Sequence, residues 1–477
     1  MATTAHDSNG AQEKPRRTSQ SSRDPELPRS RQDITEAEEG TSESGRDGGI
    51  VRVKSAGESG RRGFHPLHFF KIIWASSSRL SRAVNILWPF VPAALAVNYS
   101  KNTASPSLRF SLSYIAMVPC ANLIGFAGQE LARKMPHMLG ILTETTVGSI
   151  VEIILFLILL KNGPNNESGF NIIRAAILGS ILATMLLCLG LCFFAAGIRR
   201  HAATFDAALS EVGTGLLLMA GFGLAIPTIF NHSIDPVRYG ITQQVIEDKT
   251  TQISRVVAVL LLIAYIAFVW FQMSSHHSIY AAIFEYDEKR DADGHKDLAK
   301  AKLTLTECVF TLAASVALVT VIALALVKEI EPLVETTRIS DPFMGLILVP
   351  LVEKAAEHLT AIDEAWDNQI NFALSHCIGA TIQTAMLNAP LVVIAAWGLG
   401  KNLDLSFEVF EIAILILAII SVGNYLRDQK SDYLEGLLCI ITYVAIAVAA
   451  FYYPTLPLHE GGEGGAEGGH AERSFLM

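Results

Sequence analysis

Residues 348–360 read Leu348-Val349-Pro350-Leu351-Val352-Glu353-Lys354-Ala355-Ala356-Glu357-His358-Leu359-Thr360, within an otherwise mostly apolar segment, 341–397. Four ionisable residues therefore stand between apolar stretches long enough to cross a bilayer. A charge at membrane depth costs about 3 kcal/mol even on the milder scales, and it persists where it faces a polar cavity, a partner charge or a transported ion. We therefore expect an ion site here. The alternative is a structural salt bridge that holds two transmembrane helices together.

The charged residues of this stretch share a helical face. Lys354, Glu357 and His358 are spaced i, i+3 and i+4, which places them on one side of a helix. Glu353 lies one turn before Glu357 on the same side. The spacing concentrates the charge on one face.

An earlier stretch, residues 140–152, resembles the first. Glu144, Gly148 and Glu152 fall on one face of an apolar helix at spacings of four. A second helix follows each stretch, with small and polar residues at 177–184 and 377–383. Matching halves of this kind indicate an internal repeat, which in secondary transporters places the substrate site at the repeat interface.

The two repeat cores resemble those of the cation/calcium exchanger superfamily, and within it the calcium/proton exchangers of the fungal vacuolar type. Those proteins carry Gly-Asn-Ala-Val-Glu or Gly-Asn-Ala-Ala-Glu-His, where this chain has 148–152 and 353–358. The resemblance covers roughly residues 84–453, and is strong over 189–194, over 253–272 followed by His276-His277, and over 343–390. It implies an all-α integral membrane protein of about eleven transmembrane helices, a first helix followed by two inverted five-helix repeats.

The resemblance also implies calcium carried in exchange for protons, in the vacuolar membrane, through the paired glutamates. Calcium is expected as the transported ion, with no cofactor. It seeks six or more oxygen ligands, and protons compete for the same carboxylates. The expected ion-binding residues are Glu152, Glu357, Gly148, Ser149, Ser180, His358 and Gln383, with Lys354, Glu353 and Glu144 as modulating residues.

The chain departs from the family pattern at the site itself. Ser149 and Lys354 replace the asparagines, and Glu353 replaces the glycine before the second one. Ala183-Thr184 and Ala380-Thr381 also depart from the family pattern. Gln129, beside Glu130, stands where the family has an outer glutamate on the second helix, and Glu331 is the counterpart on the seventh. Two interpretations follow. Either Lys354 swings away and transport continues, with Glu353 restoring negative charge, or Lys354 occupies the cation site and the protein is a non-transporting or regulatory relative.

Composition agrees with a membrane protein. The chain has 477 residues, of which 51% are hydrophobic, and a mean hydropathy of +0.37. The formal net charge of -9 argues against nucleic-acid binding. The six cysteines (Cys120, Cys188, Cys192, Cys308, Cys377 and Cys439) fall in apolar segments and are interpreted as packing residues, neither a disulfide framework nor a zinc site.

Apolar length and helix breakers predict eleven spans: 83–99, 108–132, 138–160, 171–197, 204–230, 252–275, 302–327, 342–366, 370–398, 406–425 and 434–453. The domains expected are a disordered cytosolic tail (1–80), containing a short interfacial helix near 61–74, a first half (81–275), an acidic cytosolic loop acting as a solvated hinge (276–301), a second half (302–453) and a disordered Gly/Glu-rich tail (454–477). With the first tail cytosolic, the short-loop cations fall on the cytosolic side, at 133–134, 199–200 and 427–430.

Other function classes fit less well. The sequence shows no nucleophile with its base and no His-Glu-x-x-His motif, so we do not expect an enzyme. Nothing resembles a selectivity-filter loop, and a membrane scaffold would not need two matched acidic repeats. The partners expected are calcium, protons and the lipid bilayer.

Overall fold

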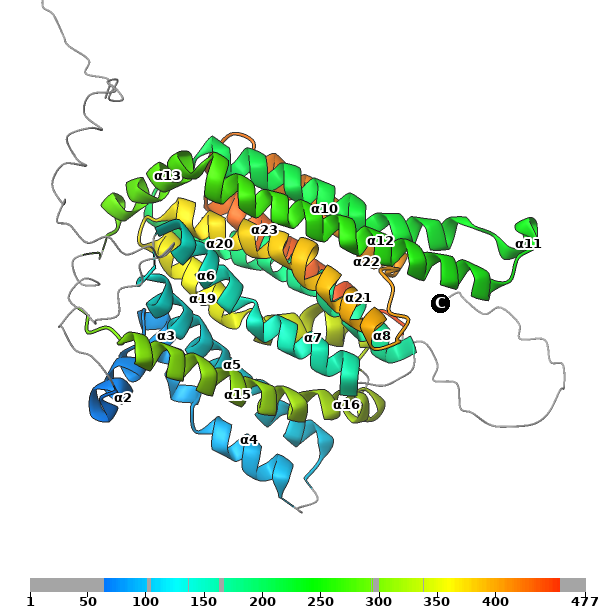
Figure 1. Ribbon diagram of the computed structural model, residues 1–477, viewed down its shortest axis with the longest axis horizontal. Helices are drawn as coiled ribbons and strands as arrows, with labels where there is room; N and C mark the ends of the chain where they lie inside the picture. Colours follow the sequence, from blue (N-terminus) through cyan, green and yellow to red (C-terminus); the bar gives the residue numbers. More distant parts are fainter. Residues whose placement is uncertain are drawn as a thin grey trace, which may run out of the picture. The chain divides into compact units, whose positions relative to one another are not determined.

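A computed structural model describes residues 64–100, 104–135, 137–162, 167–292, 294, 300–337 and 339–454 (Figure 1). The elements in chain order are α2 (Pro66–Ala75), α3 (Arg79–Val84), η1 (Asn85–Leu87), α4 (Phe90–Tyr99), α5 (Pro106–Ala132), α6 (His137–Gly148), α7 (Ile150–Asn162), α8 (Glu167–Leu182), η2 (Ala183–Cys188), α9 (Leu189–Arg199), β1 (Ala203–Thr204), α10 (Ala207–Ser233), α11 (Pro236–Tyr239), α12 (Gln243–Trp270), η3 (Phe271–Ser275), α13 (His277–Arg290), α15 (Leu305–Lys328), α16 (Ile330–Thr336), α17 (Asp341–Phe343), η4 (Met344–Leu348), α18 (Val349–Glu353), α19 (Ala355–Trp366), α20 (Ile370–Gln383), η5 (Thr384–Asn388), α21 (Ala389–Gly398), α22 (Val409–Tyr425), β2 (Lys430–Ser431) and α23 (Tyr433–Phe451). The prediction of an all-α membrane protein is confirmed.

Nine helical runs among the described residues are long and apolar enough to cross a membrane. They match nine of the eleven predicted spans. The predicted eighth span is present as α17 to α19 but is interrupted, and the predicted tenth, α22, is a shorter apolar helix. The exact number of eleven therefore remains a prediction.

The two repeats break their helices at matching positions. The helical stretch containing Glu144 is interrupted at Ser149, between α6 and α7, and the stretch containing Glu357 is interrupted at Lys354, between α18 and α19. The second helix of each repeat also contains a wider π-helical turn, η2 in one and η5 in the other. Such turns leave a local irregularity inside a helix and occur often at functional sites. The internal repeat predicted from the sequence is thus visible in the backbone.

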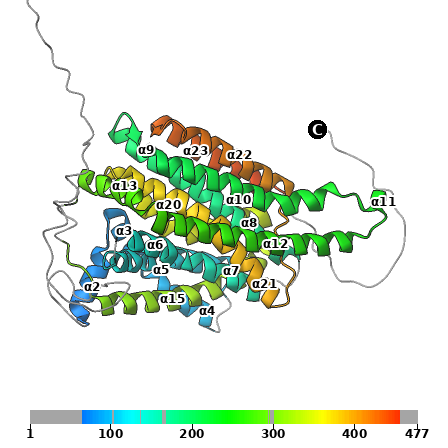
Figure 2. The ribbon, with the colours of Figure 1, turned by 45° about the horizontal axis from the view of Figure 1, so that its top comes forward.

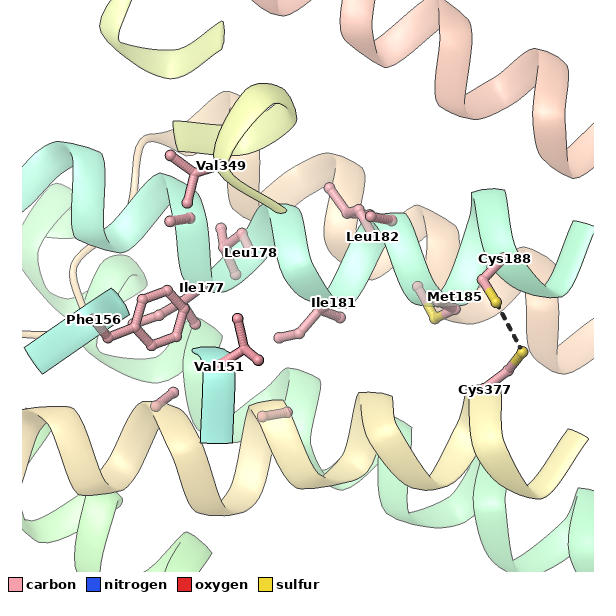
Figure 3. Packing of buried hydrophobic residues seen from close by; sticks show 14 of the residues in the cluster. Val151, Phe156, Ile177, Leu178, Ile181, Leu182, Met185, Cys188, Val349 and Cys377 are labelled. Carbon is pink, nitrogen blue, oxygen red and sulfur yellow. Dashed lines mark hydrogen bonds between the residues drawn. The ribbon is translucent and has the colours of Figure 1, made fainter. Parts of the chain in front are cut away.

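The second helix of the first repeat crosses the start of the interrupted helix of the second repeat at very short range. A Cβ placed on Gly179 would lie 2.2 Å from the backbone oxygen of Leu346, and one on Gly345 would lie 2.7 Å from the oxygen of Ile172. Only glycine allows this approach. Buried apolar residues fill the space around the crossing, with Ile177, Leu178 and Ile181 of α8 in one cluster with Val151 and Val349 (Figure 3).

The predicted cytosolic connections gather at one end of the protein. Arg199 forms an ion pair with Asp367 (3.6 Å), and Arg290 donates a hydrogen bond to Asn368. The antiparallel pair β1 and β2 joins Ala203 to Ser431 at the same end. We call it the Arg199 end. Away from it, α10 and α12 lie side by side and are joined through α11 (Figure 2).

Part of the tail predicted to be disordered is folded. In α2, Phe69 and Ile72 are buried against Leu123 and Phe126 of α5. The boundary at residue 80 is therefore wrong, because apolar side chains between 66 and 75 bury enough surface to hold this helix in place. The helix predicted near 61–74 is present as α2, and residues 1–63 of the predicted tail lie outside the described residues. The first span is interrupted at η1, just before Pro89.

The segment between the sixth and seventh spans is not a solvated hinge over its helical part. Asp287 of α13 is fully buried and accepts hydrogen bonds from the backbone amides of Asn371 (2.7 Å) and Phe372 (3.2 Å) and from the Asn371 side chain. These amides belong to the first turn of α20, so Asp287 caps that helix from a neighbouring one. The mixed charge of this segment suggested solvation, but one of its acids has a structural role.

Candidate ion-binding site

Lys354 lies between the two glutamates of the repeats. Its Nζ atom is 2.6 Å from Oε2 of Glu152 and 3.1 Å from Oε2 of Glu357. The Lys354 and Glu152 side chains are each 1% exposed, and that of Glu357 is 17% exposed. The predicted facing of the two acids is therefore found, with an ammonium group where a bound cation would stand. We call Glu152, Glu353, Lys354 and Glu357 the central cluster.

Two polar residues form hydrogen bonds with the Glu152 carboxylate, and the sequence suggested neither of them. Its Oε2 atom accepts hydrogen bonds from Oγ1 of Thr384 (2.9 Å) and Nδ2 of Asn388 (2.8 Å). Both donors belong to η5 and are spaced i, i+4 in an apolar helix, which was the available signal. These two hydrogen bonds fix the position of the Glu152 carboxylate beside Lys354.

Gly148 provides the space for the Glu357 carboxylate. A Cβ atom on Gly148 would lie 2.6 Å from Oε1 of Glu357, closer than ordinary contact allows. The helix of the first repeat therefore approaches the acid of the second repeat with its backbone. This explains why a glycine at this position suits a site shared between the repeats.

Glu353 adds a third carboxylate. Its side chain is 2% exposed, and neither oxygen accepts a hydrogen bond of acceptable geometry from any described residue. With Glu152, Glu353 and Glu357 ionised and Lys354 protonated, three negative charges and one positive charge leave the central cluster with a net charge of two negative. Burial of unbalanced charge is costly, so the cluster favours either a divalent cation or protons.

The remaining predicted ligands are buried, and among the described residues none of them forms a hydrogen bond with Glu152 or Glu357. Ser149 donates its hydroxyl to the backbone oxygen of Thr145 (3.2 Å). Ser180, His358 and Gln383 are buried, and none forms a hydrogen bond with Glu152 or Glu357 in the described part of the chain. Their role as ligands therefore stays a prediction.

The positions matching the family's outer glutamates are engaged elsewhere. Gln129 donates a hydrogen bond to Thr360 (3.2 Å), whereas Glu130 pairs with Arg133 and accepts from the amide of Leu303. Gln129 thus links α5 to the helix that carries Glu357.

Glu144 belongs to a second polar cluster that the sequence did not predict. His376 lies between Glu364, which is 2.7 Å from its Nδ1 atom, and Glu144, which is 3.8 Å from its Nε2 atom. A small cavity of about 30 Å³ is lined by Glu144 and His376 together with Glu353 and Glu357. The two clusters therefore share a cavity.

Three of the six cysteines, Cys188, Cys192 and Cys377, lie close to one another. Cys377 lies with its sulfur 3.5 Å from that of Cys188 and 3.9 Å from that of Cys192 (Figure 3). All six cysteines are free thiols and buried. Their interpretation as packing residues stays a prediction.

The sodium/calcium exchanger protein family matches residues 107–274 and 308–452, which is more than half of the chain. The chain belongs to that family. Within the exchanger family it is similar to vacuolar cation/proton exchanger 3 of Oryza sativa subsp. japonica, with 31% identity over 78% of this chain and 86% of that protein. It is also similar to the vacuolar calcium ion transporter of Schizosaccharomyces pombe, with 31% identity over 79% and 86%. The resemblance stated from the sequence is confirmed.

Two solved structures of exchangers share the fold. The structure of native YfkE superposes with a TM-score of 0.61 at 22% identity, covering 81% of this chain and 100% of that one. The structure of the H+/Ca2+ exchanger CAX gives a TM-score of 0.54 at 13% identity, covering 80% and 90%. At this identity the similarity supports the helical exchanger fold.

Proposed function

We propose that this exchanger-family protein is an antiporter that moves calcium, or a similar divalent cation, out of the cytosol in exchange for protons. The relatives support this, because their names describe a vacuolar cation/proton exchanger, a vacuolar calcium ion transporter and, in Aphanothece halophytica at 29% identity, a Ca(2+)/H(+) antiporter. The same names support a place in the vacuolar membrane. A transport role also accounts for the acids without any catalytic activity.

The grouping of three carboxylates and one ammonium in the central cluster is the observation that carries the proposal. With all four groups charged, the cluster holds two negative charges, which one calcium ion or about two protons neutralise. Glu353 restores the negative charge that Lys354 removes. Exchange requires that either the metal or the protons, and not both, occupy the cluster while the helices move between two faces.

Lys354 acts in this scheme as a built-in cation that pairs with Glu152 and Glu357. When calcium enters, the ammonium leaves at least one glutamate, and like-charge repulsion between calcium and Nζ moves it away. Glu353, whose oxygens accept no hydrogen bond from the residues that the structure describes, is the nearest acid in sequence and is available to receive it. The lysine thus keeps the acids paired when calcium is absent.

The interpretation in which Lys354 blocks the site permanently predicts the same resting contacts. The comparisons give it no support, since the relatives' names describe transporters. The two interpretations differ in flux, so a transport measurement separates them.

The test is calcium uptake into vesicles that contain the purified full chain and are acidic inside. We expect uptake that depends on the proton gradient and is lost in Glu152→Gln and in Glu357→Gln. Glu285→Gln is the matched control, because Glu285 is an exposed acid paired with Lys289. No uptake by the native protein, together with uptake by Lys354→Asn, would establish the blocked-site alternative instead.

A further inference from the structure

The second polar cluster, formed by Glu144, Glu364 and His376, is not explained by calcium exchange. These residues come from α6, α19 and α20, and their candidate ligand atoms lie within 4.8 Å of one another. Their side chains are between 12% and 22% exposed. Calcium selects oxygen ligands, whereas imidazole is typical of sites for transition metals.

The contacts of His376 have the pattern of a metal-binding histidine. Its Nδ1 atom is 2.7 Å from Glu364, and a histidine that binds metal through one nitrogen commonly donates its other N–H to a carboxylate. Its Nε2 atom is 3.8 Å from Glu144, which is too long for a hydrogen bond. That separation suits two ligands that share one ion at about 2.1 Å from each.

The cluster lies on a route to the central cluster. Along α19, Glu357 is followed by Glu364 two turns later and then by Asp367, which pairs with Arg199 at the Arg199 end. Glu144 is one turn from Gly148, whose backbone adjoins the Glu357 carboxylate. The second polar cluster thus lies between the Arg199 end and Glu357.

A second observation indicates a ligand. The cavity lined by Glu144 and His376 is also lined by Glu353, a carboxylate that is 98% buried and has no hydrogen-bond partner among the described residues. With Glu144, Glu353, Glu357 and Glu364 close to one cavity, the cations nearby are Lys354 and, when protonated, His376. The surplus of acids attracts a positive ion to this side.

We propose that Glu144 and Nε2 of His376 bind a divalent transition metal such as Mn²⁺ at a second site, with Glu364 positioning the imidazole. The site goes beyond calcium/proton exchange and does not depend on it. Transition metals bind at this site, apart from the central cluster.

The test is pulsed electron paramagnetic resonance of Mn²⁺ added to the purified full-length protein. The native protein is expected to show one bound Mn²⁺ coupled to an imidazole nitrogen. His376→Gln is expected to lose that coupling, and Glu364→Gln to weaken Mn²⁺ binding by about 10-fold to 100-fold, as the loss of a supporting carboxylate does. Glu152→Gln, which alters only the central cluster, and His277→Gln, which removes an exposed histidine, are expected to retain the signal.

The proposal is overturned if the native protein shows no nitrogen coupling, which needs no variant to fold, or if the coupling persists in His376→Gln. Loss of the signal in Glu152→Gln with retention in His376→Gln would place Mn²⁺ in the central cluster. That result would overturn the second site and leave the exchange proposal intact.

Discussion

Replacing Lys354 with asparagine removes the cation that balances Glu152 and Glu357. At an effective dielectric constant of about 20, its direct attraction is about 6 kcal/mol to the first acid at 2.6 Å and about 5 kcal/mol to the second at 3.1 Å. Much of this attraction offsets the cost of taking three charges out of water. Removing one partner of a buried ion pair typically costs about 3 to 5 kcal/mol, because the other charge is left uncompensated.

The assay is thermal unfolding of the purified protein, with calcium removed by a chelator and then restored. Without calcium, Lys354→Asn is expected to lose about 3 to 5 kcal/mol of stability. Calcium at about one hundred times its Kd is expected to return about 2.7 kcal/mol, because it fills the vacant position of the ammonium. The native protein is expected to gain less from calcium, since Lys354 competes with it.

Lys289→Asn is the matched control, because Lys289 is 72% exposed and pairs with Glu285 at the surface. It is expected to cost less than about 1 kcal/mol and to respond to calcium as the native protein does. Unchanged stability of Lys354→Asn without calcium, and no added response to calcium, would refute the charge balance described for the central cluster.

Three further substitutions test separate parts of the structure. Gly148→Ala is expected to move the Glu357 carboxylate by about 0.8 Å, from 2.6 Å to an ordinary contact near 3.4 Å, and to weaken calcium binding about tenfold in a calorimetric titration; unchanged affinity would contradict the shared space. Asn388→Leu removes a hydrogen bond to a charged acid, worth about 1.5 to 3 kcal/mol, so calcium binding should weaken by about tenfold or more in the same titration, and an unchanged affinity would count against it. Asp287→Ala leaves buried amides of α20 unpaired and should lower thermal stability by about 1 to 3 kcal/mol, whereas an unchanged melting temperature would show that the cap is dispensable.

The repeats and the paired acids could be predicted because the cost of charge in a membrane restricts where such residues occur. Glu152 and Glu357 stood out as acids at matching positions of two apolar helices. The helix breaks at Ser149 and Lys354 could not be predicted, since neither residue is a usual helix breaker. They arise where the two halves pack against each other, which the local sequence does not describe.

The partners of the acids were harder to predict, because a polar residue in an apolar helix can face any neighbour. Thr384 and Asn388 share a helical face, but only the packing of η5 against α7 shows that the face meets Glu152. Glu364 lies near the end of its span, where charge is common, and His376 belongs to a different helix. Their contact depends on the tertiary fold.

The charge of a loop was a poor guide to its structure. The mixed charges around Asp287 suggested a solvated hinge, yet this residue of α13 is buried against the first turn of α20. A single acid that caps a neighbouring helix leaves no pattern in the sequence. The error shows that composition describes the average exposure of a segment and not the role of one side chain.

The most direct measurement of the central claim is the number of protons released when calcium binds to the purified protein, obtained by calorimetry in buffers of different ionisation enthalpy. Competition at one cluster predicts net release at a pH where the acids are partly protonated, approaching about two protons per calcium as the pH falls. The number is expected to decrease in Glu152→Gln. Calcium binding without any proton release across the working pH range would contradict the claim that both ions use the same carboxylates.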